Sequence, residues 1–182
     1  MKKSRWKSLP PADQAETGFF LCRSCRQPCY GEFRFFCSRK CFDESMTVSS
    51  GGYVRAKLFE RDQGVCSLCG MDTEPFRRTL VPFQEDLTHP LMFTLYPMIV
   101  LTLRSEGWTN VRLRGSGCYP EAIEFKSFWE ADHILPVVEG GGECSLENYR
   151  TLCYICHKAT TAELTARLAQ ERRKKARKSS KQ

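Results

Sequence analysis

Residues 128–158 read FWEADHILPVVEGGGECSLENYRTLCYICHK, and this stretch decides the fold that the sequence predicts. Side chains that can bind a metal ion or carry a proton recur along it: Asp132, His133, Asn148, Cys153, Cys156 and His157. Two of the three histidines of the chain fall into this frame, whereas we interpret His89 as a packed or surface residue. Because carboxylate, imidazole and thiolate are the usual protein ligands of metals, the stretch predicts a metal-dependent site.

A second Cys-x-x-Cys pair, Cys66 and Cys69, lies far upstream of the pair formed by Cys153 and Cys156. Zinc in a structural site takes four ligands in a tetrahedron, so two such pairs are enough to close one site. The alternative is a redox Cys-x-x-Cys motif, which we rank low because there are two pairs and no βαβ pattern around either. We therefore expect one zinc ion to tie the two ends of a domain together.

The stretch from Trp129 to His157 resembles the HNH endonuclease motif, the ββα-metal fold, in the variety framed by two Cys-x-x-Cys pairs. The match covers roughly residues 53–165 and is dense over 128–158. The resemblance implies a metal-dependent DNA endonuclease that hydrolyses phosphodiester bonds and nicks one strand per site. It also implies that Asp132 and His157 hold a catalytic Mg²⁺ or Mn²⁺ ion.

His133 matches the general base of that family, and Asn148 matches a residue that either orients the base through its loop or contacts the metal. An imidazole is mostly neutral near pH 7, which suits it to take a proton from water. Neighbouring side chains on a regular strand point to opposite sides, so Asp132 and His133 cannot both face the substrate there. A bulge, or a metal at the edge of the strand, is needed to reconcile them.

The first half of the chain predicts another zinc site. Its expected ligands are four cysteines with close pairwise spacing: Cys22, Cys25, Cys37 and Cys41. The segment around Cys37, Phe36-Cys37-Ser38, resembles the FCS or MYM-type finger, a small treble-clef-like unit. Cys29 also has usable spacing, but four ligands close a structural site and we favour it as a spare thiol. We therefore expect two structural zinc ions per chain.

The net charge of +7 is concentrated at the end of the chain. Residues 158–182 contain nine Lys or Arg and two acidic residues, and the remainder of the chain is balanced. The predicted nucleic-acid-binding residues are Arg172, Arg173, Lys174, Lys175, Arg177 and Lys178. An acidic partner, a nuclear-import signal and a tail that only aids solubility are the alternatives. The tail, with the predicted DNA partner, favours a nuclear protein.

Composition also excludes some classes of protein. Eleven cysteines is an odd number, and the start of the chain has no apolar core of a signal peptide, so a secreted disulfide scaffold is not expected. The longest apolar run, residues 91–103, is interrupted by Pro97 and too short to span a membrane. We expect an intracellular protein of a reducing compartment that has no membrane partner.

The predicted fold is small and α+β. It consists of an HNH module held together by a four-cysteine zinc site and preceded by the treble-clef-like FCS zinc finger. The expected parts are a disordered basic N-terminus (1–17), the finger (18–48), the HNH domain (49–165) with an insertion (71–126), and a basic tail (166–182). We treat the insertion as packing on a small core, and its residues 91–103 do not discriminate between helix and strand.

Four elements are predicted around the motifs: a helix over 53–62, a strand over 128–138, an extended segment over 149–153, and a helix from Tyr154 that dissolves into the tail. The competing function is a non-catalytic zinc module that binds nucleic acid or a protein partner. A protein partner in a replication or repair assembly is compatible with either function.

Overall fold

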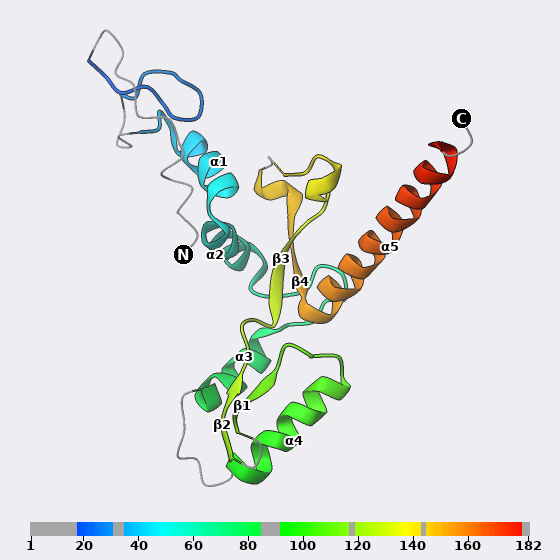
Figure 1. The fold of residues 1–182 in the computed structure, drawn as a ribbon. Coiled ribbons are helices and arrows are strands. Elements are labelled where there is room, and N and C mark those ends of the chain that lie inside the picture. The colour runs from blue at the N-terminus through cyan, green and yellow to red at the C-terminus, as the bar shows by residue number, and fades with distance from the viewer. Residues whose placement is uncertain (1–17, 31–34, 85–91, 117–118, 143–144, 180–182) are drawn as a thin grey trace. The chain divides into compact units, whose positions relative to one another are not determined.

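The computed structural model describes residues 18–30, 35–84, 92–116, 119–142 and 145–179 (Figure 1). The chain divides into two compact units, each built from two separate segments. The first unit comprises Met1–Arg61 with His133–Arg150, and the second comprises Asp62–Asp132 with Thr151–Gln182. The expected disordered N-terminus and the interpretation of His89 lie outside the described residues.

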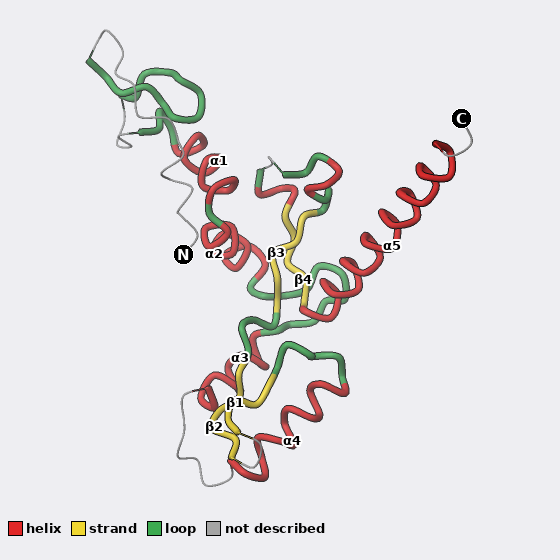
Figure 2. The backbone as a smooth tube through the Cα atoms, viewed as in Figure 1, coloured by secondary structure: helices red, strands yellow, loops and turns green. Residues whose placement is uncertain are grey.

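The first unit starts with the cysteine-rich segment and continues into two helices, α1 (Arg39–Ser49) and α2 (Gly51–Asp62) (Figure 2). The side chain of Ser38 caps α1, accepting a hydrogen bond from the Cys41 N–H at 3.2 Å. Helix α2 confirms the helix predicted over 53–62, and it buries Val54 and Leu58, which are four residues apart.

The other segment of the first unit is a loop that contains two short 3₁₀ helices, η3 (Val137–Glu139) and η4 (Leu146–Asn148). The loop presents four exposed aliphatic side chains: Ile134, Leu135, Val137 and Val138. Its backbone closes through a hydrogen bond from the Ile134 N–H to the Asn148 carbonyl oxygen at 2.8 Å. His133, the predicted general base, and Asn148, the residue predicted to orient it, therefore lie near the two ends of one closed loop.

The second unit contains helices α3 (Glu74–Leu80) and α4 (Met92–Ser105), a 3₁₀ turn η2 (Val81–Gln84), and an antiparallel hairpin of β1 (Arg112–Ser116) and β2 (Tyr119–Glu124). A register shift between Arg114 and Gly115 makes a bulge in the hairpin, and Gly115 there has a φ of 128°. These elements all lie in the predicted insertion, residues 71–126, where the sequence alone does not predict separate helices and strands.

Within the run 91–103, which the sequence does not assign, residues 92–103 form most of helix α4, and Pro97 lies inside it. Its buried side chains, Tyr96, Val100 and Leu103, follow the spacing of four and three residues that one helix face requires. Met98 and Leu101 on other faces are more than three-fifths exposed. Residues 91–103 form a nearly continuous apolar run because the helix has apolar residues both on its buried face and on its exposed faces.

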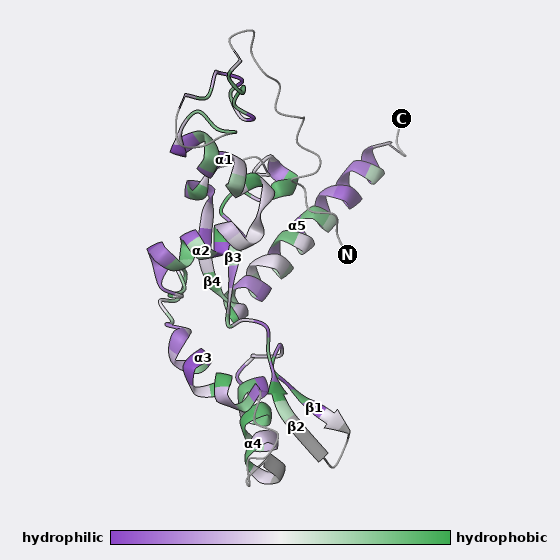
Figure 3. Cartoon of the chain, turned by 90° about the vertical axis from the view of Figure 1, so that its left-hand side faces the viewer, coloured by the Kyte–Doolittle hydropathy of each residue, from purple (hydrophilic) through white to green (hydrophobic). Residues whose placement is uncertain are grey.

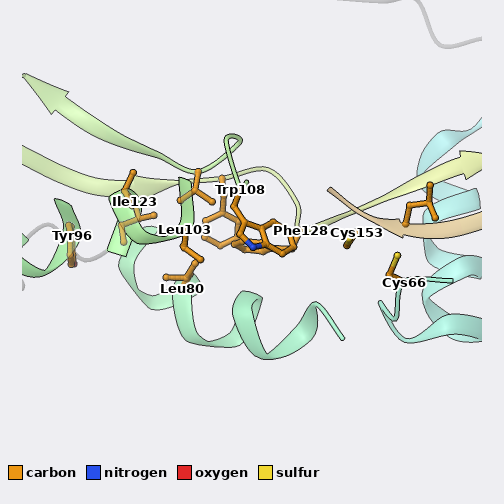
Figure 4. Close-up of a cluster of buried hydrophobic side chains, with 12 residues drawn as sticks. Cys66, Leu80, Tyr96, Leu103, Trp108, Ile123, Phe128 and Cys153 are labelled. Carbon is orange, nitrogen blue, oxygen red and sulfur yellow. The ribbon is translucent and has the colours of Figure 1, made fainter. Parts of the chain in front are cut away.

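The hydrophobic core of the second unit surrounds Trp108, which is 1% exposed (Figure 4). The ring of Trp108 packs edge-on against Phe128, with 5.3 Å between ring centroids. The cluster includes two cysteines and mostly apolar side chains: Cys66, Leu80, Tyr96, Val100, Leu103, Trp108, Val111, Ile123, Phe125, Phe128, Leu152 and Cys153. Most of these residues lie within 71–126, so that segment builds the core, which differs from our expectation that it packs on one.

A second two-stranded sheet pairs β3 (Trp129–His133) with β4 (Tyr149–Cys153), and the division between the units passes through both strands. Strand β4 confirms the predicted extended segment. Strand β3 is shorter than the predicted strand over 128–138, because after His133 the N–H groups of Ile134 and Leu135 bond to Asn148 instead of a strand. Pro136 has no N–H to extend the ladder.

The last element is the 26-residue helix α5 (Tyr154–Ser179). The prediction that this helix dissolves into the tail is wrong, since residues 166–179 remain helical. The physical reason is composition: the segment contains neither Gly nor Pro and is rich in Ala, Arg and Lys, which have high helix propensity. None of the described helices combines the length and the apolar character needed to cross a membrane.

Candidate metal centres and HNH site

The structure brings Cys66, Cys69, Cys153 and Cys156 together as predicted. Their sulfur atoms all lie within 4.8 Å of one another, and the Sγ atoms of Cys69 and Cys153 are 3.8 Å apart. The first two sulfurs come from a tight turn closed by the Gly70 N–H on the Cys66 carbonyl oxygen at 2.8 Å. The other two lie at the end of β4 and in the first turn of α5. We call this group the second cysteine cluster.

The donor set fits a zinc ion. Four sulfurs at about 2.3 Å from a tetrahedral zinc lie about 3.8 Å apart. The Sγ atoms of Cys69 and Cys153 have this separation, and no pair in the cluster is more than 4.8 Å apart. Burial acts to raise the pKa of Cys66, but hydrogen bonds from the backbone of Cys153, Cys69 and Leu68 outweigh it and lower that pKa to about 7. Burial raises the pKa of Cys156. Thiols this close need a cation before all four can ionise.

Cys22, Cys25, Cys37 and Cys41 form the first cysteine cluster, again with all four sulfurs within 4.8 Å of one another. The Sγ atom of Cys37 lies 3.4 Å from that of Cys25 and 3.6 Å from that of Cys41. A turn similar to that of the second cluster carries the first pair, since the Arg26 N–H donates to the Cys22 carbonyl oxygen at 2.9 Å. The other pair flanks the start of α1.

The titration of this cluster follows the same physics. Burial acts to raise the pKa of Cys22, yet backbone hydrogen bonds from Cys25, Cys37 and Ser24 bring it down to about 6. Hydrogen bonding to the Cys25 and Cys41 side chains raises the pKa of Cys37 to about 12. Cys29 is buried but outside the group of four sulfurs, and burial raises its pKa. Cys118 and Cys144 lie outside the described residues.

Asp132 and His157 lie close together in the second unit, with 3.8 Å between Asp132 Oδ1 and His157 Nε2. Two ligands of an octahedral Mg²⁺ at about 2.1 Å stand about 3.0 Å apart in adjacent positions and about 4.2 Å apart in opposite ones. The observed separation falls between these limits, and both side chains are partly exposed. The two donor atoms are therefore near enough to reach one small ion after a rotation of either side chain, and His157 directly follows Cys156 of the second cysteine cluster.

His133 ends strand β3 in the first unit, and its ring packs on Tyr149 with 4.2 Å between ring centroids. Its Nε2 atom is buried and has no hydrogen-bond partner among the residues that the structure describes. A neutral imidazole with an unengaged ring nitrogen can accept a proton.

Asn148 holds the loop of the first unit closed. Its Oδ1 accepts the Leu135 N–H at 2.8 Å, and its Nδ2 donates to the carbonyl oxygens of Leu135 at 3.1 Å and Gly141 at 3.2 Å. A Cβ atom at Gly141 would lie 1.8 Å from the Leu135 carbonyl oxygen, so this close approach requires glycine. Both Nδ2 hydrogens are engaged, which favours a role for Asn148 in shaping the loop.

Arg61 is a residue that the sequence does not single out. From the end of α2 it donates to the carbonyl oxygen of Leu146 at 3.3 Å and to that of Tyr149 at 2.9 Å. These two acceptors flank Asn148, so Arg61 fixes the loop from outside. No local sequence signal could have revealed this, because the partners are 85 and 88 residues away.

The predicted nucleic-acid-binding residues of the tail all lie on α5 and are exposed. Figure 3 shows the C-terminal half of this helix as predominantly hydrophilic. Consecutive helical residues point in different directions, so Arg172, Arg173, Lys174 and Lys175 distribute charge around the helix instead of forming one stripe.

The family model described as HNH endonuclease matches residues 119–163. Residues 119–163 therefore carry an HNH endonuclease domain, as the resemblance of residues 128–158 predicts. The matched range contains the pair Asp132–His157, the loop of Asn148, and half of the second cysteine cluster.

Two curated relatives indicate which HNH endonucleases the chain resembles. The chain is 40% identical over 138 residues to human "DNA annealing helicase and endonuclease ZRANB3", a match that covers 75% of this chain and 11% of that protein. Mouse ZRANB3 is 36% identical over 142 residues, covering 76% and 12%. The order of finger, helix and HNH motif predicts this relationship, and the identity confirms that the chain is homologous to the HNH region of ZRANB3.

Among solved structures, the crystal structure of the human ZRANB3 HNH domain is 33% identical and covers 69% of this chain and 98% of that chain, with a TM-score of 0.39. The chain spans only about an eighth or less of the length of the curated relatives. What those relatives do as whole proteins thus does not follow from the match.

Proposed function

We propose that this protein is a metal-dependent DNA endonuclease that hydrolyses phosphodiester bonds and nicks one strand per site. The observation that carries the proposal is the spacing of Asp132 and His157 in an HNH domain, where both can bind one divalent ion. The endonuclease named in the relatives supports the same chemistry. A preference for particular DNA structures, and a place in DNA repair or replication, belong to this proposal.

Asp132 and His157 would hold the ion, Mg²⁺ or Mn²⁺, in a site that leaves coordination positions for water and a phosphate oxygen. Such an ion, when bound, neutralises charge on the nonbridging oxygens and polarises the scissile group. The carboxylate of Asp132 contributes the negative charge that a hard cation prefers.

His133 would act as the general base. Its buried Nε2 atom has no partner in the described part of the chain, and its ring packs on Tyr149. Asn148 would hold the loop that begins next to His133, through its three hydrogen bonds to loop backbone atoms. Arg61 would support the same loop from α2, which makes it a positioning residue.

The two cysteine clusters would each hold one structural zinc ion, since each offers four sulfurs at tetrahedral spacing. The first cluster with α1 would form the FCS-type finger, and β3, β4 and α5 would form the ββα-metal arrangement. The basic residues of α5 would contact the phosphate backbone of DNA. The same charges support nuclear localisation, and the finger offers a surface for a protein partner in a replication or repair assembly.

A plasmid-nicking assay in Mg²⁺ tests the proposal. We expect wild type to convert supercoiled into nicked DNA, and we expect His133→Ala and Asp132→Asn to cut roughly 10²–10⁴ times more slowly, the usual contribution of a positioned base or ligand. Glu147→Gln is the matched control, because it neutralises an exposed carboxylate in the same loop without touching the site.

Elemental analysis should give two zinc ions for wild type and for all three variants, which shows that the variants fold. If His133→Ala cuts as fast as wild type, the assignment of the base is wrong. If wild type shifts DNA in gels but cuts no forked, nicked or single-stranded DNA in Mg²⁺ or Mn²⁺, the chain is a non-catalytic zinc module.

A further inference from the structure

A pocket of the second unit remains outside the site described above. It has a volume of about 440 Å³ and lies where the start of β1, the end of β2, β3 and the start of α5 meet. Its polar lining comes from Asn110, Arg112, Glu124, Lys126, Ser127 and Glu130. This volume falls in the range of small-molecule sites in proteins, and the polar side chains stand beside apolar surface, as they do in such sites.

One wall of the pocket has an unused hydrogen-bonding atom. The Asn110 side chain donates from Nδ2 to the Ser127 carbonyl oxygen at 2.6 Å, which fixes the orientation of the amide. Its Oδ1 atom is buried and accepts no hydrogen bond from any residue in the described ranges. A buried acceptor without a donor is unfavourable, so this wall is complementary to a ligand that carries an N–H group.

The charges of the pocket disfavour a simple anion. Arg112 and Glu124 are directly opposite each other in the β1–β2 hairpin, and Lys126 and Glu130 add one charge of each sign. Two carboxylates repel a phosphate, whereas mixed donors and acceptors match the edge of a neutral nucleobase. Phe125 and Tyr154 add aromatic rings to the lining, and aromatic rings are the usual platforms for bases.

The pocket adjoins the pair formed by Asp132 and His157. Glu130 and Asp132 are two residues apart on β3 and therefore lie on the same side of the strand, about 6.6 Å apart along it. Tyr154 and His157 are three residues apart in the first turn of α5 and share a face of the helix. On each element, one residue lines the pocket and the other is a predicted ligand of the ion. The step of about 6.6 Å along β3 is comparable with the length of one nucleotide in an unstacked strand.

We propose that this pocket binds one unstacked nucleobase of the DNA, next to the phosphate held at Asp132 and His157. The inference rests on the proposed function and adds a substrate feature to it: DNA with an unpaired nucleotide beside the cleavage point. Lys158, which donates to Thr109 Oγ1 at 3.3 Å, and the Tyr154 hydroxyl, 3.0 Å from the same atom, brace the rim between pocket and pair.

Binding without cleavage tests this inference. The probes are three otherwise identical duplexes, with one unpaired 2-aminopurine, with the same base paired, and with an abasic residue in the unpaired position. Binding is measured in EDTA by fluorescence anisotropy on the full chain. We expect the unpaired base to bind about tenfold more tightly than the abasic residue, as one base contact in a stacking pocket allows. Emission of the unpaired 2-aminopurine should change on binding.

Asn110→Leu, which keeps the size of the side chain and removes its acceptor, should reduce the preference to less than about twofold. Because this residue also holds Ser127, Lys126→Ala provides a second variant at an exposed position of the pocket. Arg104→Ala is the matched control, since it removes one exposed positive charge outside the pocket. It should weaken binding to all three duplexes equally and keep the preference.

Equal binding of the base and the abasic residue by wild type overturns the inference, and so does a preference that both pocket variants retain. Lack of binding to any of the duplexes overturns it as well. The outcome is separable from the nuclease proposal. If wild type prefers the unpaired base but cuts no DNA, the pocket stands and the nuclease fails. If wild type cuts DNA without this preference, the nuclease proposal holds and the pocket inference is wrong.

Discussion

The two cysteine clusters share their local architecture and differ in what surrounds them. In each, a tight Cys-x-x-Cys turn supplies two sulfurs, and the other two come from one residue just before a helix and one in its first turn. The first cluster draws its ligands from residues 22–41, and its buried neighbours are few: Cys29, Phe36 and the cysteines themselves. The second cluster draws its ligands from residues 66–156 and places two of them in a twelve-residue core.

This difference indicates that a metal ion would have a different structural role in each cluster. In the first cluster a metal would take the place of a hydrophobic core, as in other very small domains. In the second cluster the core exists already, and a metal would join distant segments and hold β4 against the turn of Cys66. The Ser67 N–H donates to the Thr151 carbonyl oxygen there at 2.9 Å. Loss of the two metals should therefore have unequal consequences.

The largest expected effect separates Cys66→Ser from Cys25→Ser. Cys66→Ser should abolish nicking and remove the cooperative unfolding transition, because apparent zinc-binding energies of roughly 10–16 kcal/mol are coupled to folding. Cys25→Ser, at an exposed position of the first cluster, should remove one zinc ion and leave that transition. Elemental analysis and calorimetry measure both, and equal losses of stability would contradict the comparison.

An intermediate effect is expected from the cores themselves. Trp108→Ala should lower the free energy of unfolding by about 3–5 kcal/mol, because it opens a cavity in the core of the second unit. Phe36→Leu, in the first cluster, retains apolar volume and should cost less than about 1.5 kcal/mol. Urea unfolding followed by tryptophan fluorescence and circular dichroism compares them. A small effect of Trp108→Ala would mean that the metal alone holds the second unit.

The smallest expected effect tests which sulfurs belong to the first cluster. Cys29→Ala should leave the zinc content at two per chain and reduce stability by about 1 kcal/mol, since only a small buried side chain is trimmed. Cys41→Ala is the matched control, because it also removes a buried cysteine and should lower the zinc content to one. Loss of zinc from Cys29→Ala would make Cys29 a ligand and Cys41 or another cysteine the spare.

A large part of the candidate site is readable without coordinates. Metal ligands with fixed local spacing, such as Cys153-x-x-Cys156-His157, leave a pattern in the chain because one turn must present several donor atoms. The helix over 53–62 and the extended segment over 149–153 are predictable because their periodicity is local. The end of β3 at His133 is not, since the competing bonds come from Asn148, fifteen residues later.

The order of chemical groups along residues 128–158 by itself indicated the HNH domain, and the two Cys-x-x-Cys pairs indicated which cysteines gather, because four thiols at such short spacing are typical of a zinc site. Tertiary structure alone decided the rest. The contact of Arg61 with the loop of Asn148, the core around Trp108 and the pocket at Asn110 depend on residues that approach only after folding. Long-range packing leaves no periodic signature in a single sequence, which is why the segment 71–126 could be read only in three dimensions.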